Sequence, residues 1–315
     1  MSGIEITLYL VGGLVLLFIG AEGLIRGSSS LAIKIGITPL VVGLTVVSFG
    51  TSAPELVVSL KAALMGNSSI AMGNVLGSNV ANIALILGIS AIIRPLNVHA
   101  DVIRREIPIM IGASVLVFFL SLDGSLGIIE GIIFLLILIL YTIISIVLAR
   151  KEKNPDVKTE FEEGLKSKLN VPLSIILMIG GLGLLILGAN LFVQGAVVLA
   201  KLFQISDVVI GLTIIAIGTS LPELITSIVA SYKNEADIAI GNIVGSNIFN
   251  LLCILGITAI ILPISTRGIS IIDWIVMLFC ALILLPLSKT GFRISRIEGG
   301  LLFTGYIIYV YFLLP

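Results

Sequence analysis

The sequence is poor in the residue types that build thiolate, imidazole and nucleic-acid sites. It holds two cysteines, Cys253 and Cys280, and one histidine, His99. Two cysteines inside apolar stretches argue against a disulfide framework or a thiolate metal site, and one histidine cannot build a histidine-based metal site. Lysine and arginine balance aspartate and glutamate, so the net charge is zero and no basic field would attract nucleic acid.

Charged residues of either sign are also scarce. They make up 11% of the 315 residues, whereas hydrophobic residues make up 58%, and the mean hydropathy is +1.23. A soluble domain of this length carries about a quarter charged residues. The apolar stretches run for about 20 residues or more without period-two alternation, which predicts transmembrane helices and not a β-barrel. No positive residue precedes the first stretch, so we expect a retained span there and not a cleaved signal peptide.

Ten candidate spans can be marked from the apolar runs. They cover residues 4–27, 38–64, 68–93, 104–121, 126–149, 172–199, 207–231, 235–262, 270–288 and 295–314. Several exceed the ~20 residues that cross the hydrocarbon, which predicts tilted or broken helices. The expected fold class is therefore an all-α membrane protein with ten transmembrane helices.

The placement of lysine and arginine predicts the orientation of these spans. With the N-terminus outside, 15 of the 18 basic residues fall in inside connections and 3 in outside connections. Basic residues concentrate on the cytoplasmic side of membrane proteins. This split predicts an inner (plasma) membrane protein with both termini outside.

The longest polar stretch, residues 150–170, mixes both charge signs and is too short for a folded domain. We interpret it as a solvated cytoplasmic linker between a first half, residues 1–149 with spans 1–5, and a second half, residues 171–315 with spans 6–10. No regulatory domain is expected.

The two halves repeat each other at an offset of 168 residues. Residues 41–96 align without a gap on residues 209–264, and 28 of these 56 positions are identical. Because each copy holds five spans, the second must enter the membrane with the opposite orientation. Inverted repeats are typical of secondary transporters, whose substrate sites lie near the midplane between the halves. The repeat therefore predicts alternating access.

The first polar segment of each copy interrupts an apolar span. It reads Gly-Thr-Ser-Ala-Pro-Glu at residues 50–55 of span 2 and Gly-Thr-Ser-Leu-Pro-Glu at residues 218–223 of span 7. Proline disrupts the helix before it but suits the start of a new one, which a preceding threonine or serine can cap. We expect broken helices whose freed carbonyls, together with Glu55 and Glu223, face a cation. Since no lysine or arginine lies in the middle of the spans to pair with these glutamates, a functional role is the stronger interpretation.

The second polar segment forms a stripe on spans 3 and 8. Three side chains recur every four residues in each copy: Asn74, Ser78 and Asn82, and their repeat mates Asn242, Ser246 and Asn250. Small polar residues also join transmembrane helices by hydrogen bonds, so this alternative remains open for all six. Together, spans 2, 3, 7 and 8 are expected to form the core as broken helices.

The candidate ligands are carboxylate, hydroxyl, amide and carbonyl oxygens. Hard oxygen ligands suit Na+ and Ca2+ and disfavour Zn2+ or Cu+. Two carboxylates neutralise one Ca2+, and competition for shared ligands is the simplest physical basis for exchange. If the carboxylates lie close together, protons would also compete.

These paired segments resemble the two alpha-repeats of the calcium/cation antiporter superfamily, and most closely its prokaryotic sodium/calcium exchanger branch. The resemblance covers nearly the whole chain. It implies exchange of cytosolic Ca2+ for an excess of external Na+, which would be electrogenic. It also implies that spans 1 and 6 slide across the other eight to switch access.

The resemblance further implies a ligand set. Its carboxylates are Glu55 and Glu223; hydroxyl or carbonyl oxygens come from Thr51, Ser52, Thr219 and Ser220; spans 3 and 8 add Ser78, Asn82, Ser246 and Asn250. One departure concerns Asn250, where some sodium/calcium exchangers and the potassium-dependent ones have aspartate. The lower negative charge argues against K+ co-transport and leaves the Na+ count and the role of protons open.

Three alternatives can be weighed against this hypothesis. A proton-driven antiporter of the same fold is the runner-up, although that branch typically carries a further acid in the second motif. A passive cation channel is less favoured, because channels use symmetric rings of ligands. An intramembrane hydrolase lacks support, since His99 lies outside the spans. We thus expect no enzyme and no cofactor, with Na+, Ca2+ and the lipid bilayer as partners of a chain that functions as a monomer.

Overall fold

The structure is a computed structural model that describes residues 3–151, 169–204, 216–267 and 269–313. Its helices fall into ten segments, which we number as spans 1–10. The first half contains span 1, α1 (Gly3–Ile35); span 2, α2 (Pro39–Val42), the π-helical η1 (Gly43–Val47), α3 (Ser48–Thr51) and α4 (Ala53–Leu64); span 3, α5 (Ser68–Val80), η2 (Ala81–Leu87) and α6 (Gly88–Ile93); span 4, η3 (Val102–Glu106) and α7 (Ile107–Leu120); and span 5, α8 (Ile128–Lys151).

The second half follows the same order. It contains span 6, α10 (Val171–Leu202); span 7, α12 (Ala216–Thr219) and α13 (Leu221–Tyr232); span 8, α14 (Ala236–Phe249), η5 (Asn250–Ile254) and α15 (Leu255–Ile261); span 9, α16 (Ile271–Lys289); and span 10, α17 (Arg296–Leu313). Eight of these agree within three residues with the spans expected from the sequence, whereas span 1, expected at residues 4–27, continues as helix to Ile35. The first part of the expected span 7 and most of the expected linker 150–170 lie outside the described residues, so the proposed domain boundaries remain predictions.

The lengths of the helices suit a membrane. Within the described ranges, six single helices are long and apolar enough to cross a bilayer, and the pair Pro39–Thr51 and Ala53–Leu64, bent by 43°, makes a seventh. Spans 3 and 8 are interrupted less strongly than span 2, because η2 and η5 insert π-helical turns into continuous helices. π-helical turns commonly mark functional positions.

Two short antiparallel strand pairs join the connections at the helix ends. Strand β1 (Leu96–Asn97) pairs with β4 (Arg293–Ile294), and β2 (Ser125–Leu126) pairs with β3 (Ile264–Ser265). The connections after spans 3 and 9 therefore share one side of the molecule, and those after spans 4 and 8 share the other. This agrees with the alternation of inside and outside connections that the ten-span topology requires.

Spans 3 and 8 form the centre of the molecule. Their apolar windows are 78% and 89% buried, against 22–33% for spans 1, 5, 6 and 9. In the centre α14 meets η1 at backbone contact, since a Cβ on Gly245 would lie 2.6 Å from the carbonyl oxygen of Leu44. Small residues allow this approach, which burial of apolar surface alone cannot drive inside a membrane.

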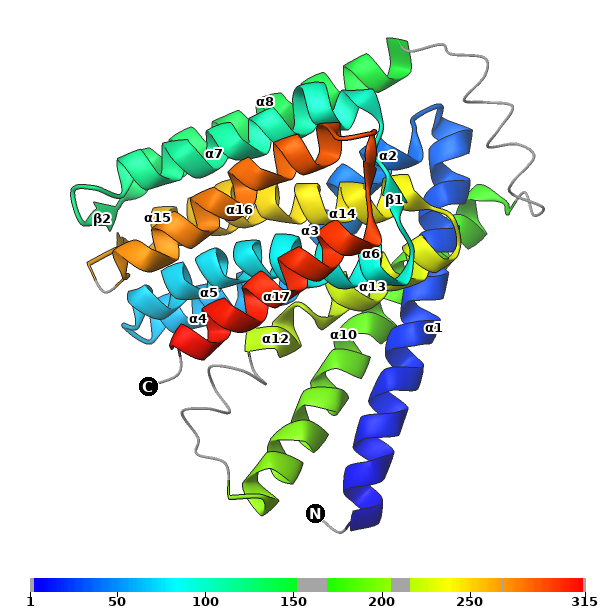
Figure 1. Cartoon of the computed structure of the whole chain (residues 1–315), viewed down its shortest axis with the longest axis horizontal. Helices are drawn as coiled ribbons and strands as arrows, with labels where there is room; N and C mark the ends of the chain where they lie inside the picture. The colour runs from blue at the N-terminus through cyan, green and yellow to red at the C-terminus, as the bar shows by residue number, and fades with distance from the viewer. Residues whose placement is uncertain (1–2, 152–168, 205–215, 268, 314–315) are drawn as a thin grey trace.

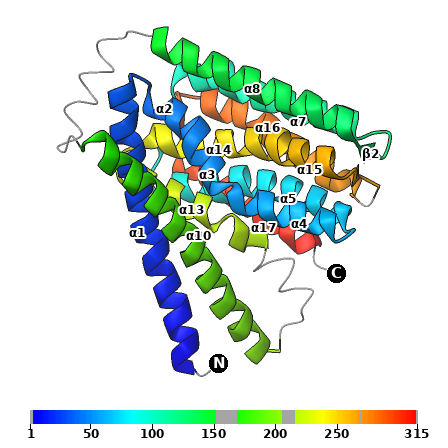
Figure 2. The ribbon, with the colours of Figure 1, turned by 180° about the vertical axis from the view of Figure 1, so that it is seen from behind.

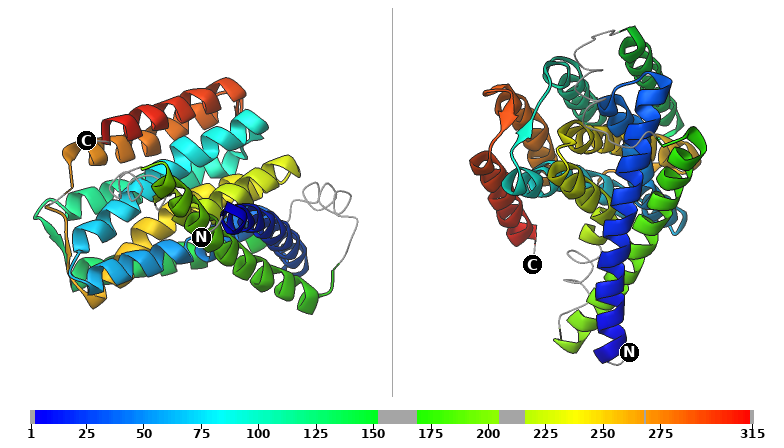
Figure 3. Two further views of the ribbon diagram at one scale, coloured as in Figure 1. Left: turned by 90° about the horizontal axis from the view of Figure 1, so that it is seen from below. Right: turned by 90° about the vertical axis from the view of Figure 1, so that its right-hand side faces the viewer.

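Helices α1 and α10 form a separate pair. They lie side by side and run across the other eight spans (Figure 1). The N-terminal part of α1 and the C-terminal part of α10 extend beyond those spans, as the view from behind also shows (Figure 2). The pair lies on one side of the eight-span group, with α17 at the opposite side (Figure 3).

Candidate cation-binding site

Each of spans 2 and 7 changes direction at a serine. Ser52 separates α3 from α4 with φ −80° and ψ 2°, and Ser220 separates α12 from α13 with φ −90° and ψ 7°. A proline follows two residues later in both spans, where the first turn of the new helix needs no donor. The next residue is the glutamate, so Glu55 and Glu223 lie in the first turns of α4 and α13.

The two serines cross-link the halves through these glutamates. The Ser52 hydroxyl donates to Oε1 of Glu223 at 3.0 Å, and the Ser220 hydroxyl donates to Oε1 of Glu55 at 3.0 Å. Both glutamate side chains are 1% exposed. The threonines that precede the serines, Thr51 and Thr219, lie beside the glutamate of the opposite half. The structure thus brings together the two carboxylates and their hydroxyl neighbours from both broken helices.

Spans 3 and 8 contribute paired asparagines to the same centre. Nδ2 of Asn82 donates to Oδ1 of Asn247 at 3.0 Å, and Nδ2 of Asn250 donates to Oδ1 of Asn79 at 3.2 Å. In these bonds the amide nitrogens of Asn82 and Asn250 donate to other asparagines. Their amide oxygens therefore remain available to accept a ligand. Asn79 and Asn247 were not among the sequence candidates. The available signal was that they occupy equivalent positions at the repeat offset, next to Ser78 and Ser246.

Several oxygens in this buried centre have no hydrogen-bond partner among the described residues. They are Oε2 of Glu55, Oε2 of Glu223, Oδ1 of Asn82, Oδ1 of Asn250 and Oγ of Ser246. Buried polar atoms are rarely left unpaired, because each costs free energy without a partner. Neither glutamate forms an ion pair within the described residues. Uncompensated carboxylates and unpaired oxygens together make a site suited to a cation.

A second pair of asparagines supports the broken helices from outside this centre. Asn74 donates to the Ser59 hydroxyl at 2.9 Å and to the Glu55 carbonyl oxygen at 3.2 Å. Its repeat mate, Asn242, donates in the same way to Ser227 at 3.1 Å and accepts from the Thr51 hydroxyl at 3.0 Å. For Asn74 and Asn242 the helix-joining interpretation therefore holds.

Ser78 is the one remaining candidate. It is buried on α5, 5% exposed, one turn before Asn82. Among the described residues, no group of three or more histidine, cysteine, aspartate or glutamate side chains forms a conventional metal centre. The ligand inventory is therefore two carboxylates plus neutral oxygens.

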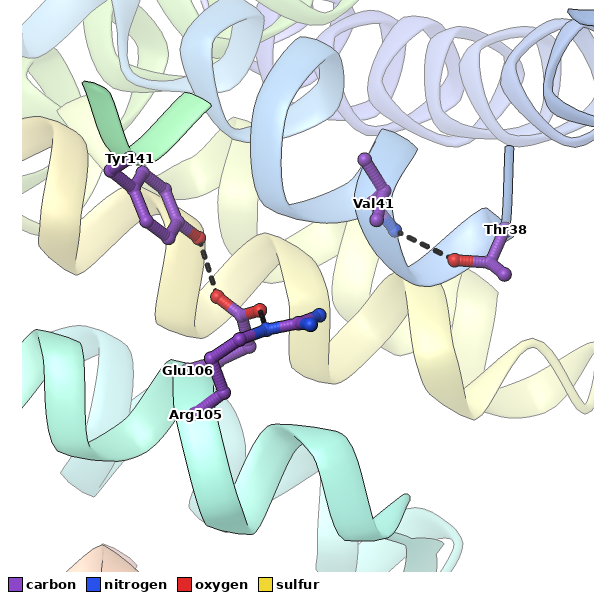
Figure 4. A network of polar contacts seen from close by, with 5 residues as sticks. All are labelled: Thr38, Val41, Arg105, Glu106 and Tyr141. Carbon is purple, nitrogen blue, oxygen red and sulfur yellow. Dashed lines mark hydrogen bonds and ion pairs between the residues drawn. The ribbon is translucent and has the colours of Figure 1, made fainter. Parts of the chain in front are cut away.

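Glu106 is a third buried carboxylate, which the sequence reasoning missed. It is fully buried at the end of η3, where Nε of Arg105 donates to Oε1 at 2.7 Å and the Tyr141 hydroxyl donates to Oε2 at 2.7 Å. Figure 4 shows both donors directed at the carboxylate, near the capping bond from Val41 N to Thr38 at the start of α2. Because both oxygens are satisfied and the charge is paired, Glu106 holds span 4 to span 5 and is not a ligand.

Comparison with known proteins places this geometry among cation transporters. The profile of the family described as sodium/calcium exchanger protein matches residues 5–147 and 173–314. Sodium/calcium exchanger MaX1 of Methanosarcina acetivorans is 33% identical over an alignment 346 residues long, which covers 96% of this chain and 97% of MaX1. Inner membrane protein YrbG of Escherichia coli is 40% identical over 311 residues, which cover 96% of this chain and 95% of YrbG.

Solved structures agree with these sequence matches. A structure of the sodium-calcium exchanger NCX_Mj soaked with zero Na+ and Ca2+ superposes with a TM-score of 0.85 at 32% identity, covering 99% of this chain and all of that one. Another, soaked with 10 mM Na+ and 10 mM Sr2+, gives the same score and identity with 98% and 99% coverage. The all-α membrane fold of ten helices in two inverted repeats is thereby confirmed.

Proposed function

The chain belongs to the sodium/calcium exchanger family and is thus a multi-pass membrane cation antiporter and not an enzyme; we propose that it exchanges Ca2+ for Na+ by alternating access. The observation that carries this proposal is the set of unpaired oxygens contributed by both halves: Oε2 of Glu55 and Glu223, and Oδ1 of Asn82 and Asn250. Four buried oxygens with two negative charges suit hard cations.

The charge of this set supports competition between the two ions. Two carboxylates balance one Ca2+ or two Na+, and the amide oxygens add neutral ligands at no electrostatic cost. Since the same oxygens serve both ions, Ca2+ must leave before Na+ can occupy them. An excess of Na+ over the two that balance the carboxylates makes the exchange electrogenic.

The α1–α10 pair is the proposed moving part. A Cβ on Gly20 would lie 2.7 Å from the carbonyl oxygen of Gly181, so the two helices touch at backbone distance. Helices in such contact move together, whereas their lipid-facing sides carry exposed apolar residues. Sliding of this pair across the other eight spans would uncover the cation site from one side and then from the other.

Flux measurements in proteoliposomes test the proposal. The parent protein should take up 45Ca2+ when a Na+ gradient is imposed and should not when Na+ is replaced by choline. Glu55→Gln and Glu223→Gln each remove one of the two charges that balance Ca2+, so each should reduce uptake at least tenfold. Undiminished exchange in either variant would overturn the assignment of the ligands.

A matched control separates loss of charge from loss of fold. Glu298→Gln removes a glutamate whose Oε2 only accepts bonds from Ser295 at the start of α17. Its Na+-dependent uptake should stay within about twofold of the parent, provided that the measured amount of folded protein is the same.

A proton-driven antiporter of the same fold is the second candidate. The observation in its favour is that the site holds two neighbouring buried carboxylates, Glu55 and Glu223. Two such carboxylates can share a proton between them. Ca2+ uptake that requires an outward proton gradient and ignores Na+ would establish this candidate in place of Na+ exchange.

We further propose an inner-membrane location with both termini outside, and function as a monomer. The location is supported by the 15 to 3 distribution of basic residues and by the inner-membrane relative YrbG. An alkaline phosphatase fused after Pro315 should be active and a fluorescent protein fused there should be dark, since each reports the side of the membrane. The reverse pattern would overturn the orientation.

A further inference from the structure

A basic pocket lies at the end of the molecule where the connections after spans 3, 7 and 9 meet. Its volume is about 610 Å³. Arg94 at the end of α6, Arg293 on β4 and Arg296 at the start of α17 line it, and no acidic residue does. Tyr232, another lining residue, is nine residues beyond Glu223, or about 14 Å along α13 at 1.5 Å per residue. The pocket is therefore separate from the cation site.

The three arginines have no carboxylate partner among the described residues. Arg94 donates to the carbonyl oxygen of Tyr232 at 3.3 Å, and Arg296 donates to that of Ile93 at 3.4 Å. The side chain of Arg293 makes no hydrogen bond or ion pair within the described part of the chain. A neutral carbonyl oxygen fixes a guanidinium in place without neutralising it, so three positive charges remain around one cavity.

Nearby acids do not neutralise this cavity. Asp237 pairs with His99 at 3.4 Å. Burial, and then the Asp237 carboxylate, raise the pKa of Glu235, and neither of these two acids lines the cavity. A cavity with this excess of positive charge repels cations and attracts an anion. This argues against a site that holds Na+ or Ca2+ before transport.

The donors of the pocket fit a phosphate group. Guanidinium groups present paired N–H donors that match two phosphate oxygens, and each arginine keeps most of its five donors here. Asn97, Asn234 and Tyr232 also line the pocket, and their side chains carry neutral donors. The groups come from three connections and the helix ends beside them, so the folded molecule, and not one basic segment, assembles the pocket.

The rim of the pocket indicates that the phosphate belongs to a lipid. Ile92 and Ile93 on α6 are 38% and 40% exposed, and Ile297 on α17 is 77% exposed. These two helices touch closely, since a Cβ on Gly299 would lie 2.7 Å from the carbonyl oxygen of Gly88. Exposed apolar side chains beside basic residues at helix ends are the arrangement found where acyl chains give way to headgroups.

We propose that this pocket binds the phosphate group of an anionic membrane lipid. The lipid sits with its headgroup among Arg94, Arg293 and Arg296 and its acyl chains along the exposed isoleucines of α6 and α17. The site is independent of which cations the protein exchanges. It also differs from general attraction to a negative membrane surface, because it requires arginines that converge on one cavity.

Thermal unfolding in an uncharged detergent tests the proposal. Phosphatidylglycerol should raise the unfolding midpoint of the parent protein, and phosphatidylcholine with the same acyl chains should not, because a ligand bound only to the folded state stabilises it. In Arg293→Gln, the phosphatidylglycerol concentration that gives half of the maximal shift in the unfolding midpoint should rise at least threefold. Replacing all three arginines with glutamine should abolish the difference between the two lipids.

The control variant is Arg267→Gln, which removes the same group from the opposite end of the molecule and should respond to phosphatidylglycerol like the parent. If the triple variant does not fold, Arg293→Gln decides alone, because the Arg293 side chain makes no bond within the described residues that its loss would break. Equal shifts with both lipids, or an undiminished shift in Arg293→Gln, would overturn the proposal. A shift with millimolar glycerol 3-phosphate but none with phosphatidylglycerol would overturn the lipid assignment in favour of a soluble phosphate.

Discussion

At the scale of single residues, the two carboxylate oxygens of each glutamate in the site have different roles. Oε1 of Glu55 and of Glu223 is held by a serine from the opposite half, whereas Oε2 has no hydrogen-bond partner among the residues that the structure describes. The held oxygen fixes the orientation of the carboxylate, and the free oxygen faces the place of the ion. Glu106 lacks this division, since donors occupy both of its oxygens.

The serines should therefore set the affinity for cations. Ser52→Ala and Ser220→Ala each remove one hydrogen bond to a charged acceptor, which is worth about 1.5–3 kcal/mol. We expect the half-saturating Ca2+ concentration to rise roughly tenfold or more in each variant, because a loose carboxylate must be ordered when the ion binds. The dependence of 45Ca2+ uptake on Ca2+ concentration measures this change.

The control for the serines is Ser121→Ala. Ser121 is also buried, but its hydroxyl donates only to the carbonyl oxygen of Val117 in its own helix. The half-saturating Ca2+ concentration of Ser121→Ala should stay unchanged. An unaltered value in both site variants would show that the serines do not position the glutamates.

Glu106 should behave as a structural residue. Glu106→Gln removes the charge that Arg105 and Tyr141 share, and loss of such bonds costs about 1–3 kcal/mol. We expect a lower unfolding midpoint, but uptake per folded molecule within about twofold of the parent. Tyr141→Phe should also lower the unfolding midpoint, but by less than Glu106→Gln, because Arg105 still pairs with the carboxylate. Loss of uptake with an unchanged unfolding midpoint would instead place Glu106 in the transport path.

At the scale of helices, the sequence predicted most of the features that depend on residues within a single helix. The apolar runs predicted the spans, and Pro54 and Pro222 predicted the breaks, because proline acts on its own helix. The π-helical turns of η2 and η5 were not predictable, since the asparagines that open or lie in them carry no local signal for that geometry.

Contacts between helices were harder to predict. The repeat predicted that Glu55 and Glu223 are equivalent, but not that each binds the serine of the other half. Asn79 and Asn247 were missed for the same reason: their role depends on the partner across the interface and not on their own helix. Glu106 was missed because Arg105 beside it makes the segment look like the charged end of a span.

Glycines on α1 should determine whether the α1–α10 pair holds together. A Cβ on Gly20 would lie 2.7 Å from a backbone oxygen of α10, whereas a Cβ on Gly12 meets nothing within 4 Å. Overpacking of this kind costs about 1–3 kcal/mol. Gly20→Ala should lower the unfolding midpoint and reduce uptake severalfold, while Gly12→Ala, on the same helix, should leave both unchanged. Equal effects of the two substitutions would show that the close contact is not the cause.

At the scale of the whole molecule, one symmetry relates the contacts. Adding 168 to residues of the first half, and subtracting it from residues of the second, turns the bond from Ser52 to Glu223 into the bond from Ser220 to Glu55. The same operation turns the pairing of Leu96 with Ile294 into the pairing of Leu126 with Ile264. The site thus lies where the halves exchange contacts, so neither half completes it alone.

An ion pair connects the α1–α10 pair to the helix that carries Glu223. Lys233, at the end of α13, donates to Glu22 of α1, which also pairs with Arg26 on its own helix. The Lys233 and Glu22 side chains are 27% and 22% exposed. If the pair slides, this ion pair forms in one access state and breaks in the other. It would then bias the balance between states without touching the ion.

Lys233→Met should therefore shift this balance away from the state described here. A partly exposed ion pair contributes about 1 kcal/mol or less, which corresponds to at most roughly a fivefold change in the ratio of the two states. The half-saturating Ca2+ concentration should rise on the side to which this state opens and fall on the other, which uptake and release assays measure separately. Arg26→Gln removes an ion pair within α1 and leaves the link between the moving parts, so it should shift neither value. Because both substitutions remove one positive charge near Glu22, changes of the same sign on both sides, or equal effects of the two variants, would mean that local charge, and not the link to α13, is responsible.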